Sequence, residues 1–176
     1  MVGGAMKEHK GAVTFQGNPL TLTGNMPRVG ENAPDVTLID NDFKPFRFSG
    51  LRGKVCVLLS LPSLDTSVCD MEARRFNREA EGLGADVHIL VISKDLPFAQ
   101  KRWCGAAGAH QVQTFSDYKE GEFGRGYGLY IKELGLLARS VIILDREGVV
   151  RYLQLVGDIG SEPDYDTAIS EIKKLI

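Results

Sequence analysis

The sequence predicts an α/β fold in which helices cover both faces of a mixed β-sheet. The first observation is a pair of short, almost wholly apolar runs at residues 54–61 and 87–93, which are typical of strands buried on both faces. The second is that a segment with helical periodicity follows each run, at 66–83 and at 97–105. Strand–helix units of this kind place a sheet between layers of helices.

The N-terminal elements are predicted to be a β-hairpin and a short strand. Apolar and polar residues alternate at 13–16 and again at 20–22, with the turn-forming residues Gly17-Asn18-Pro19 between them. After a loop rich in Pro, Gly and Asn, a further strand is expected at 36–39 and ends at the turn signal Asp40-Asn41-Asp42.

The first helix is predicted at 66–83 and is amphipathic. Charged residues such as Glu72 lie between its apolar residues, and Gly82 and Gly84 end it. The apolar residues at helical spacing are Val68, Met71, Phe76, Ala80 and Leu83.

The remaining elements continue the mixture of strands and helices. The second helix opens at Asp95-Leu96-Pro97, and a short helix interrupted by glycine follows near 120–127. Residues 140–144 and 149–156 are predicted to form a hairpin, and an amphipathic helix at 163–175 is the last element.

Composition and net charge limit the classes of protein that this sequence can belong to. A chain of 176 residues can bury a substantial core, and we see no internal repeat or domain boundary. We therefore assign residues 13–176 to one domain and residues 1–12 to an N-terminal extension. The net charge of −2 without a clustered Lys/Arg stripe argues against nucleic-acid binding.

The hydropathy pattern argues against a membrane protein. No apolar run is long enough to cross a bilayer. The first ten residues lack the apolar segment and cleavage site of a signal peptide. These features predict a cytoplasmic protein.

Three cysteines are the candidates for chemistry. No C-x-x-C pair is present, which argues against a zinc site and against a thioredoxin-type redox centre. Cys56 lies inside an apolar run and is interpreted as structural. Cys104 lies 35 positions after Cys69, on the next helix, and this spacing alone supports a disulfide between them only weakly.

Cys69 lies in the first turn of the helix that follows a buried strand. The free N–H groups and positive dipole of a helix start stabilise a thiolate, which favours a nucleophile. Packing as a small hydrophobe is the alternative, but the position is off the apolar side marked by Val68 and Met71. Thr66 suits either an N-cap or a hydrogen bond from its hydroxyl to the sulfur or to a substrate oxygen, and Pro62 either ends the strand or shields the thiolate.

The segment around Cys69 resembles a known family. Residues 62–69 fit the P-x-x-x-T-x-x-C signature of peroxiredoxins, and the run PSLDTSVC is similar to the thiol peroxidase branch, which is atypical two-cysteine. The similarity covers nearly everything after residue 12. It continues at residues 15–19, 74–77, 95–105, 139–145 and 162–165.

This resemblance implies a thioredoxin-like fold and a set of site residues. Cys69 would be the peroxidatic cysteine and Cys104 the resolving cysteine, with Pro62, Thr66 and Arg139 completing the active site. It also implies a homodimer reduced by thioredoxin. Taken alone, Arg139 would be interpreted as a charge flanking a strand; in the implied site its guanidinium stabilises the thiolate and holds the peroxide oxygens. The N-terminal extension and Cys56 depart from the family pattern.

The function predicted in this way is reduction of hydrogen peroxide and organic hydroperoxides. Cys69 would become a sulfenic acid and then form an intrachain disulfide with Cys104, without a metal or organic cofactor. The first turn of the helix is expected to unwind before the two sulfurs meet. One alternative is a non-enzymatic redox sensor that signals through a partner protein; a general thiol–disulfide oxidoreductase is disfavoured by the missing C-x-x-C.

Overall fold

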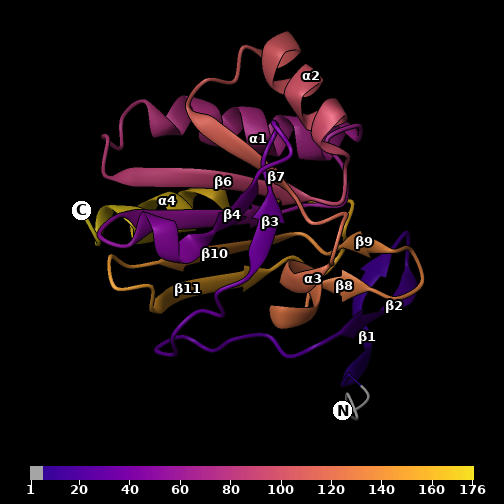
Figure 1. Ribbon diagram of the computed structural model, residues 1–176. Coiled ribbons are helices and arrows are strands. Elements are labelled where there is room, and N and C mark those ends of the chain that lie inside the picture. Colours follow the sequence, from indigo (N-terminus) through magenta and orange to yellow (C-terminus); the bar gives the residue numbers. More distant parts are fainter. Residues whose placement is uncertain (1–5) are drawn as a thin grey trace.

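The computed structural model describes residues 6–176 and contains two β-sheets (Figure 1). The larger sheet has the strand order β11-β10-β5-β6-β7-β3-β4, and the smaller has the order β1-β2-β8-β9. The strands are β1 Glu8–Phe15, β2 Asn18–Thr23, β3 Thr37–Ile39, β4 Pro45–Arg47, β5 Val55–Ser60, β6 Val87–Ser93, β7 Val112–Ser116, β8 Tyr130–Ile131, β9 Leu136–Leu137, β10 Ser140–Leu144 and β11 Val150–Leu155. The helices are α1 Ser67–Ala80, α2 Pro97–Ala107, α3 Glu122–Gly126 and α4 Tyr165–Lys173, with a 3₁₀ turn at Phe48–Leu51.

The predicted N-terminal hairpin is confirmed by the antiparallel pairing of β1 with β2. Its two turn residues, Gln16 and Gly17, have positive φ values of 52° and 80°, as the tight turns of right-twisted hairpins require. Strand β1 begins at Glu8, so residues 8–12 of the stretch assigned to an extension belong to the small sheet. The first five residues of that stretch lie outside the described residues.

The centre of the large sheet consists of the two apolar runs seen in the sequence. Strand β5 is buried along its whole length and pairs parallel with β6 on one side and antiparallel with β10 on the other. Strand β6 then pairs parallel with β7. The sequence-based prediction missed β7 and the short strands β4, β8 and β9, because these have only two to five residues and owe their extended form to pairing.

Helices lie on both faces of the large sheet, as predicted (Figure 1). On one face, Phe76 of α1 and Ile169 and Ile172 of α4 share a buried cluster with β5 and β6. On the other face, Phe123 of α3 packs with residues of the small sheet and with the alternate side chains of β5 and β6. Helix α2 packs beside α1, over β7. No helix among residues 6–176 is long and apolar enough to span a membrane.

The buried side of α1 differs from the one predicted. Its buried residues are Cys69, Glu72, Ala73 and Phe76, whereas Met71 is 48% exposed. The argument that Cys69 lies off the apolar side of the helix was therefore wrong. Periodicity misassigned the face because it treats Glu72 as a solvent-facing charge, and in the fold this carboxylate is buried against a cation.

Candidate active site

Cys69 occupies the first turn of α1, the helix that follows the carboxyl end of β5 in the chain. Thr66 is the N-cap: its Oγ1 accepts a hydrogen bond of 3.3 Å from the backbone N–H of Cys69. The Thr66 hydroxyl in turn donates to the carbonyl oxygen of Ser63 at 3.1 Å. The expected helix-start position is confirmed, and the Cys69 side chain is completely buried.

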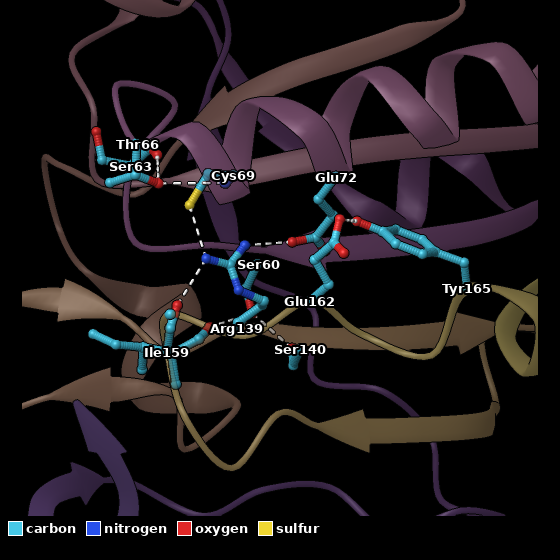
Figure 2. A network of polar contacts seen from close by, with 12 residues as sticks. Ser60, Ser63, Thr66, Cys69, Glu72, Arg139, Ser140, Ile159, Glu162 and Tyr165 are labelled. Carbon is cyan, nitrogen blue, oxygen red and sulfur yellow. Dashed lines mark hydrogen bonds and ion pairs between the residues drawn. The ribbon is translucent and has the colours of Figure 1, made fainter. Parts of the chain in front are cut away.

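Arg139 links the thiol to a buried carboxylate (Figure 2). One terminal nitrogen, Nη2, donates to Cys69 Sγ at 3.1 Å and to the carbonyl oxygen of Ile159 at 2.8 Å. The other, Nη1, donates to Glu72 Oε2 at 2.5 Å. Arg139 comes immediately before β10 and is 1% exposed, so the guanidinium lies between the sheet and α1 in a site that excludes water.

Burial acts in opposite directions on the pKa values of Glu72 and Arg139. It raises the pKa of Glu72 from 4.5 to about 7; Arg139 opposes this rise and the Glu162 carboxylate adds to it. For Arg139, burial acts to lower the pKa but is outweighed by the charges of Glu72 and Cys69, so the pKa is raised. The guanidinium therefore remains a cation beside the sulfur.

Hydroxyl groups fix the backbone on both sides of Arg139. Ser60, at the end of β5, lies with its hydroxyl 2.6 Å from that of Ser140 and donates to the Ala138 carbonyl oxygen at 2.8 Å. Beyond Glu72, the Tyr165 hydroxyl donates to Glu162 at 3.1 Å, which extends the network toward the surface (Figure 2). Among residues 6–176, Glu72 Oε1 and Arg139 Nε have no hydrogen-bond partner.

The sequence-based prediction missed Glu72 and these hydroxyl groups. Glu72 is three residues after Cys69 and thus on the same side of the helix, which is the one local signal that pointed to it. Ser60 is a single polar residue at the end of an apolar strand. Nothing in the sequence indicates that its hydroxyl meets that of Ser140, because the pairing of β5 with β10 brings them together.

Cys104 lies apart from this network. It is half-buried on α2, and its sulfur lies 3.3 Å from Thr114 Oγ1, whose hydroxyl donates to Asn41 Oδ1 at 2.9 Å. Both Cys69 and Cys104 are free thiols with different partners. The structure thus brings together Cys69, Thr66 and Arg139, but does not bring Cys104 into contact with them.

Pro62 is buried and begins the loop that connects β5 to α1. Asp95 holds this loop: it accepts hydrogen bonds from the Ser63 hydroxyl at 2.7 Å and from the backbone N–H of Leu64 at 2.8 Å. Asp95 comes two residues after β6, so the end of the neighbouring parallel strand fixes the loop before the cysteine.

Cys56 is buried in β5, and burial raises the pKa of its thiol to about 11. With this raised pKa it stays a neutral thiol near pH 7, as its interpretation as a structural residue requires. Within residues 6–176, no group of three or more His, Cys, Asp or Glu side chains is placed to hold a metal ion.

One large cavity lies away from these residues. It has a volume of about 640 Å³ and is lined by residues of the N-terminal hairpin and the following loop, including Lys7, His9 and Arg28. None of the predicted site residues lines it. We therefore place the site by its chemistry and not by cavity size.

A buried arginine in contact with a cysteine at a helix start, on a mixed sheet covered by helices, defines a thiol-dependent redox protein. Residues 28–169 match the Redoxin family. The chain is 47% identical to a thiol peroxidase of Bacillus subtilis over 164 residues, covering 93% of this chain and 98% of that protein. It is 45% identical to a thiol peroxidase of Streptococcus pneumoniae, covering 93% and 99% of the two chains.

Solved structures agree with this assignment. The fold matches a peroxiredoxin-like protein of Aquifex aeolicus with a TM-score of 0.88 and 39% identity, covering 98% of this chain and all of that one. A thiol peroxidase of Chromobacterium violaceum, 20% identical and with a TM-score of 0.82, shares the fold. The chain belongs to the thiol peroxidase family and is a peroxidase of the peroxiredoxin type, which confirms the resemblance and the thioredoxin-like fold expected from the sequence.

Proposed function

We propose that Cys69 reduces hydroperoxides and that Cys104 converts its oxidised form to a disulfide, which thioredoxin then reduces. The observation that carries the assignment of Cys69 is the hydrogen bond of 3.1 Å from Arg139 to its sulfur inside a buried network. A guanidinium at this distance, together with the N-terminal dipole of α1, favours the thiolate, which is the nucleophilic form.

In the first step the thiolate of Cys69 attacks the terminal oxygen of the hydroperoxide. The O–O bond breaks, the sulfur takes the terminal oxygen as a sulfenic acid, and the departing alkoxide or hydroxide takes up a proton. Arg139 stabilises the negative charge that moves from sulfur to the leaving oxygen, and the Thr66 hydroxyl positions the substrate. Pro62 closes the site against water.

The second step needs a change of structure. The sulfur of Cys104 is hydrogen-bonded to Thr114, and the sulfur of Cys69 is hydrogen-bonded to Arg139. Both hydrogen bonds must break before the two sulfurs can form a disulfide. Unwinding of the first turn of α1 would move Cys69 out of the core, and Thr66 and Ser67 at the start of this turn are already exposed. Hydrogen exchange around Cys69 would be equally slow in both redox states if the turn stayed folded.

The test is steady-state consumption of hydrogen peroxide and of an alkyl hydroperoxide with thioredoxin and its reductase. We expect Cys69→Ser to abolish turnover. In Cys104→Ser the reaction should stop at the sulfenic acid of Cys69, which a sulfenic-acid-trapping reagent then labels. Cys56→Ala is the matched control and should keep full turnover. A wild-type enzyme that turns over once despite excess thioredoxin would favour the redox-sensor alternative.

We also propose that the enzyme is a homodimer, as the family resemblance implies, and that it is located in the cytoplasm, as the hydropathy pattern of the sequence predicts. Sedimentation analysis of the reduced protein tests the first of these proposals. A monomer at micromolar concentration would contradict it.

A further inference from the structure

The residues next to the two reactive cysteines are hydrogen-bonded to each other. Asp70, which follows Cys69, accepts a hydrogen bond of 2.7 Å at Oδ1 from the indole Nε1–H of Trp103, which precedes Cys104. Asp70 lies in the first turn of α1 and Trp103 lies in α2. This bond therefore joins the two segments that carry the sulfurs.

Both ends of the bond are held by further contacts. The Asp70 carboxylate also accepts from Arg74 Nε at 3.0 and 2.9 Å, and Arg74 Nη1 donates to the Ala107 carbonyl oxygen in the last turn of α2 at 3.4 Å. The Trp103 ring packs against the buried cluster between α1, α4 and the sheet. Asp70 thus ties the first turn of α1 to a side chain anchored in the core.

Few other side chains hold this turn. Thr66 and Ser67 are exposed, and the capping bond of Thr66 is long, at 3.3 Å. The two strong anchors are Cys69, through Arg139, and Asp70, through Trp103. Oxidation weakens the first anchor, because a neutral sulfenic acid is a poorer partner for a guanidinium than a thiolate is.

We propose that the Asp70–Trp103 hydrogen bond is the latch that keeps the first turn of α1 folded after Cys69 is oxidised, and that its strength sets the rate of disulfide formation. Asp70 and Trp103 are positioning residues in this proposal, since neither touches the peroxide. The proposal rests on the proposed function of Cys69 and Cys104.

The latch controls a competition between two reactions of the sulfenic acid. In one, the Cys104 thiol attacks the sulfenic sulfur: an S–S bond forms, the S–O bond breaks, and hydroxide leaves with the thiol proton as water. In the other, a second hydroperoxide oxidises the sulfenic acid to a sulfinic acid and is itself reduced to the alcohol or water. The first reaction needs the turn unwound, whereas the second needs it folded.

The decisive variant is Trp103→Phe, which removes the donor and keeps an aromatic ring in the cluster. We expect the hydroperoxide concentration that inactivates half of the enzyme during turnover to rise about fivefold, the effect of losing one net hydrogen bond. Asp70→Asn, which keeps an acceptor without the charge, should give a smaller rise. Mass spectrometry of the Cys69 peptide measures the sulfinic acid directly.

Two controls separate the latch from a general loss of stability. Glu79→Gln removes the Arg75–Glu79 pair of 3.0 Å on the same helix without touching Asp70. Ile172→Val loosens the buried cluster from α4. Wild-type tolerance in Trp103→Phe, or an equal rise in either control at matched thermal stability, would overturn the proposal.

Trp103 also reports on the latch, because it is the single tryptophan of the chain. We expect its fluorescence emission to change when the disulfide forms, and the reduced Asp70→Asn enzyme to emit more like the oxidised wild type. Identical emission in reduced and oxidised wild type would contradict the latch.

Peptide mapping of the wild type tells the two proposals apart, since a missing Cys69–Cys104 disulfide refutes the proposed function itself.

Discussion

Glu72 offers the sharpest test of the electrostatics of the site. The substitution is Glu72→Gln, which keeps the shape of the side chain and removes the ionisable group. Glu72 is completely buried, and burial raises its pKa from 4.5 to about 7 despite the neighbouring Arg139. At 1.36 kcal/mol per unit, this rise corresponds to about 3 kcal/mol of folding free energy that depends on pH.

The sign follows from the protons bound in each state. Between pH 4.5 and about 7, native Glu72 holds a proton that the unfolded chain has already released. Stability therefore falls as the pH rises through this window, and the contribution of the protonated group is fully present only below pH 4.5. Glutamine cannot titrate, so this part of the pH dependence is absent from the variant.

The assay is urea unfolding of the reduced wild type and of Glu72→Gln at several pH values from 4.5 to 8. The unfolding free energy of the wild type minus that of the variant should fall by about 3 kcal/mol across the series. Glu79→Gln, on the same helix, is the matched control and should follow the wild type. A difference that is independent of pH, or that increases with pH, would refute the reasoning, because it would mean that Glu72 is an ordinary ionised carboxylate.

Three further substitutions test the contacts around Cys69. Arg139→Lys should slow oxidation of Cys69 by about 10²-fold in stopped-flow measurements, because the single nitrogen of an ammonium cannot replace the two separated nitrogens that contact Glu72 on one side and Ile159 and the sulfur on the other; a rate near that of the wild type would contradict this role. Thr66→Ala removes the cap of α1 and should lower the unfolding free energy by about 1 kcal/mol, measured with urea. Asp95→Asn loosens the loop before the cysteine and should reduce kcat/KM for peroxide by about tenfold at unchanged secondary structure, as judged by circular dichroism.

Local signals in the sequence were enough to predict the elements that carry Cys69. Residues 87–93 were predicted as a strand with the bounds that β6 has, because an apolar run between turn signals needs no information from elsewhere in the chain. The helix start at residues 66–69 followed from capping chemistry and from the preceding strand. In contrast, β7 has only five residues and a mixed composition, so its strand form depends on β6 beside it.

The partners of Cys69 were much harder to predict from the sequence. Arg139 lies 70 positions after Cys69 and was assigned only through the family resemblance. Glu72 was grouped with the charged residues of an amphipathic helix, because its partner is 67 positions away and periodicity carries no information about such pairs. The bond between Asp70 and Trp103 spans 33 positions and depends on how α1 and α2 pack.

The two buried cysteines show why these distant partners matter for reactivity. Cys56 belongs to the apolar cluster on the other face of the sheet, and burial holds its thiol in the neutral form. Cys69 is buried at least as deeply, but a guanidinium lies 3.1 Å from its sulfur. The guanidinium interacts with Glu72 as well as with the sulfur. When Glu72 is protonated it attracts the guanidinium less, so the guanidinium stabilises negative charge on the sulfur more strongly. Raising the pH through 7 ionises Glu72 and so directs part of the Arg139 charge away from Cys69. The carboxyl group that costs stability above neutral pH thus also competes for the cation that activates the thiol.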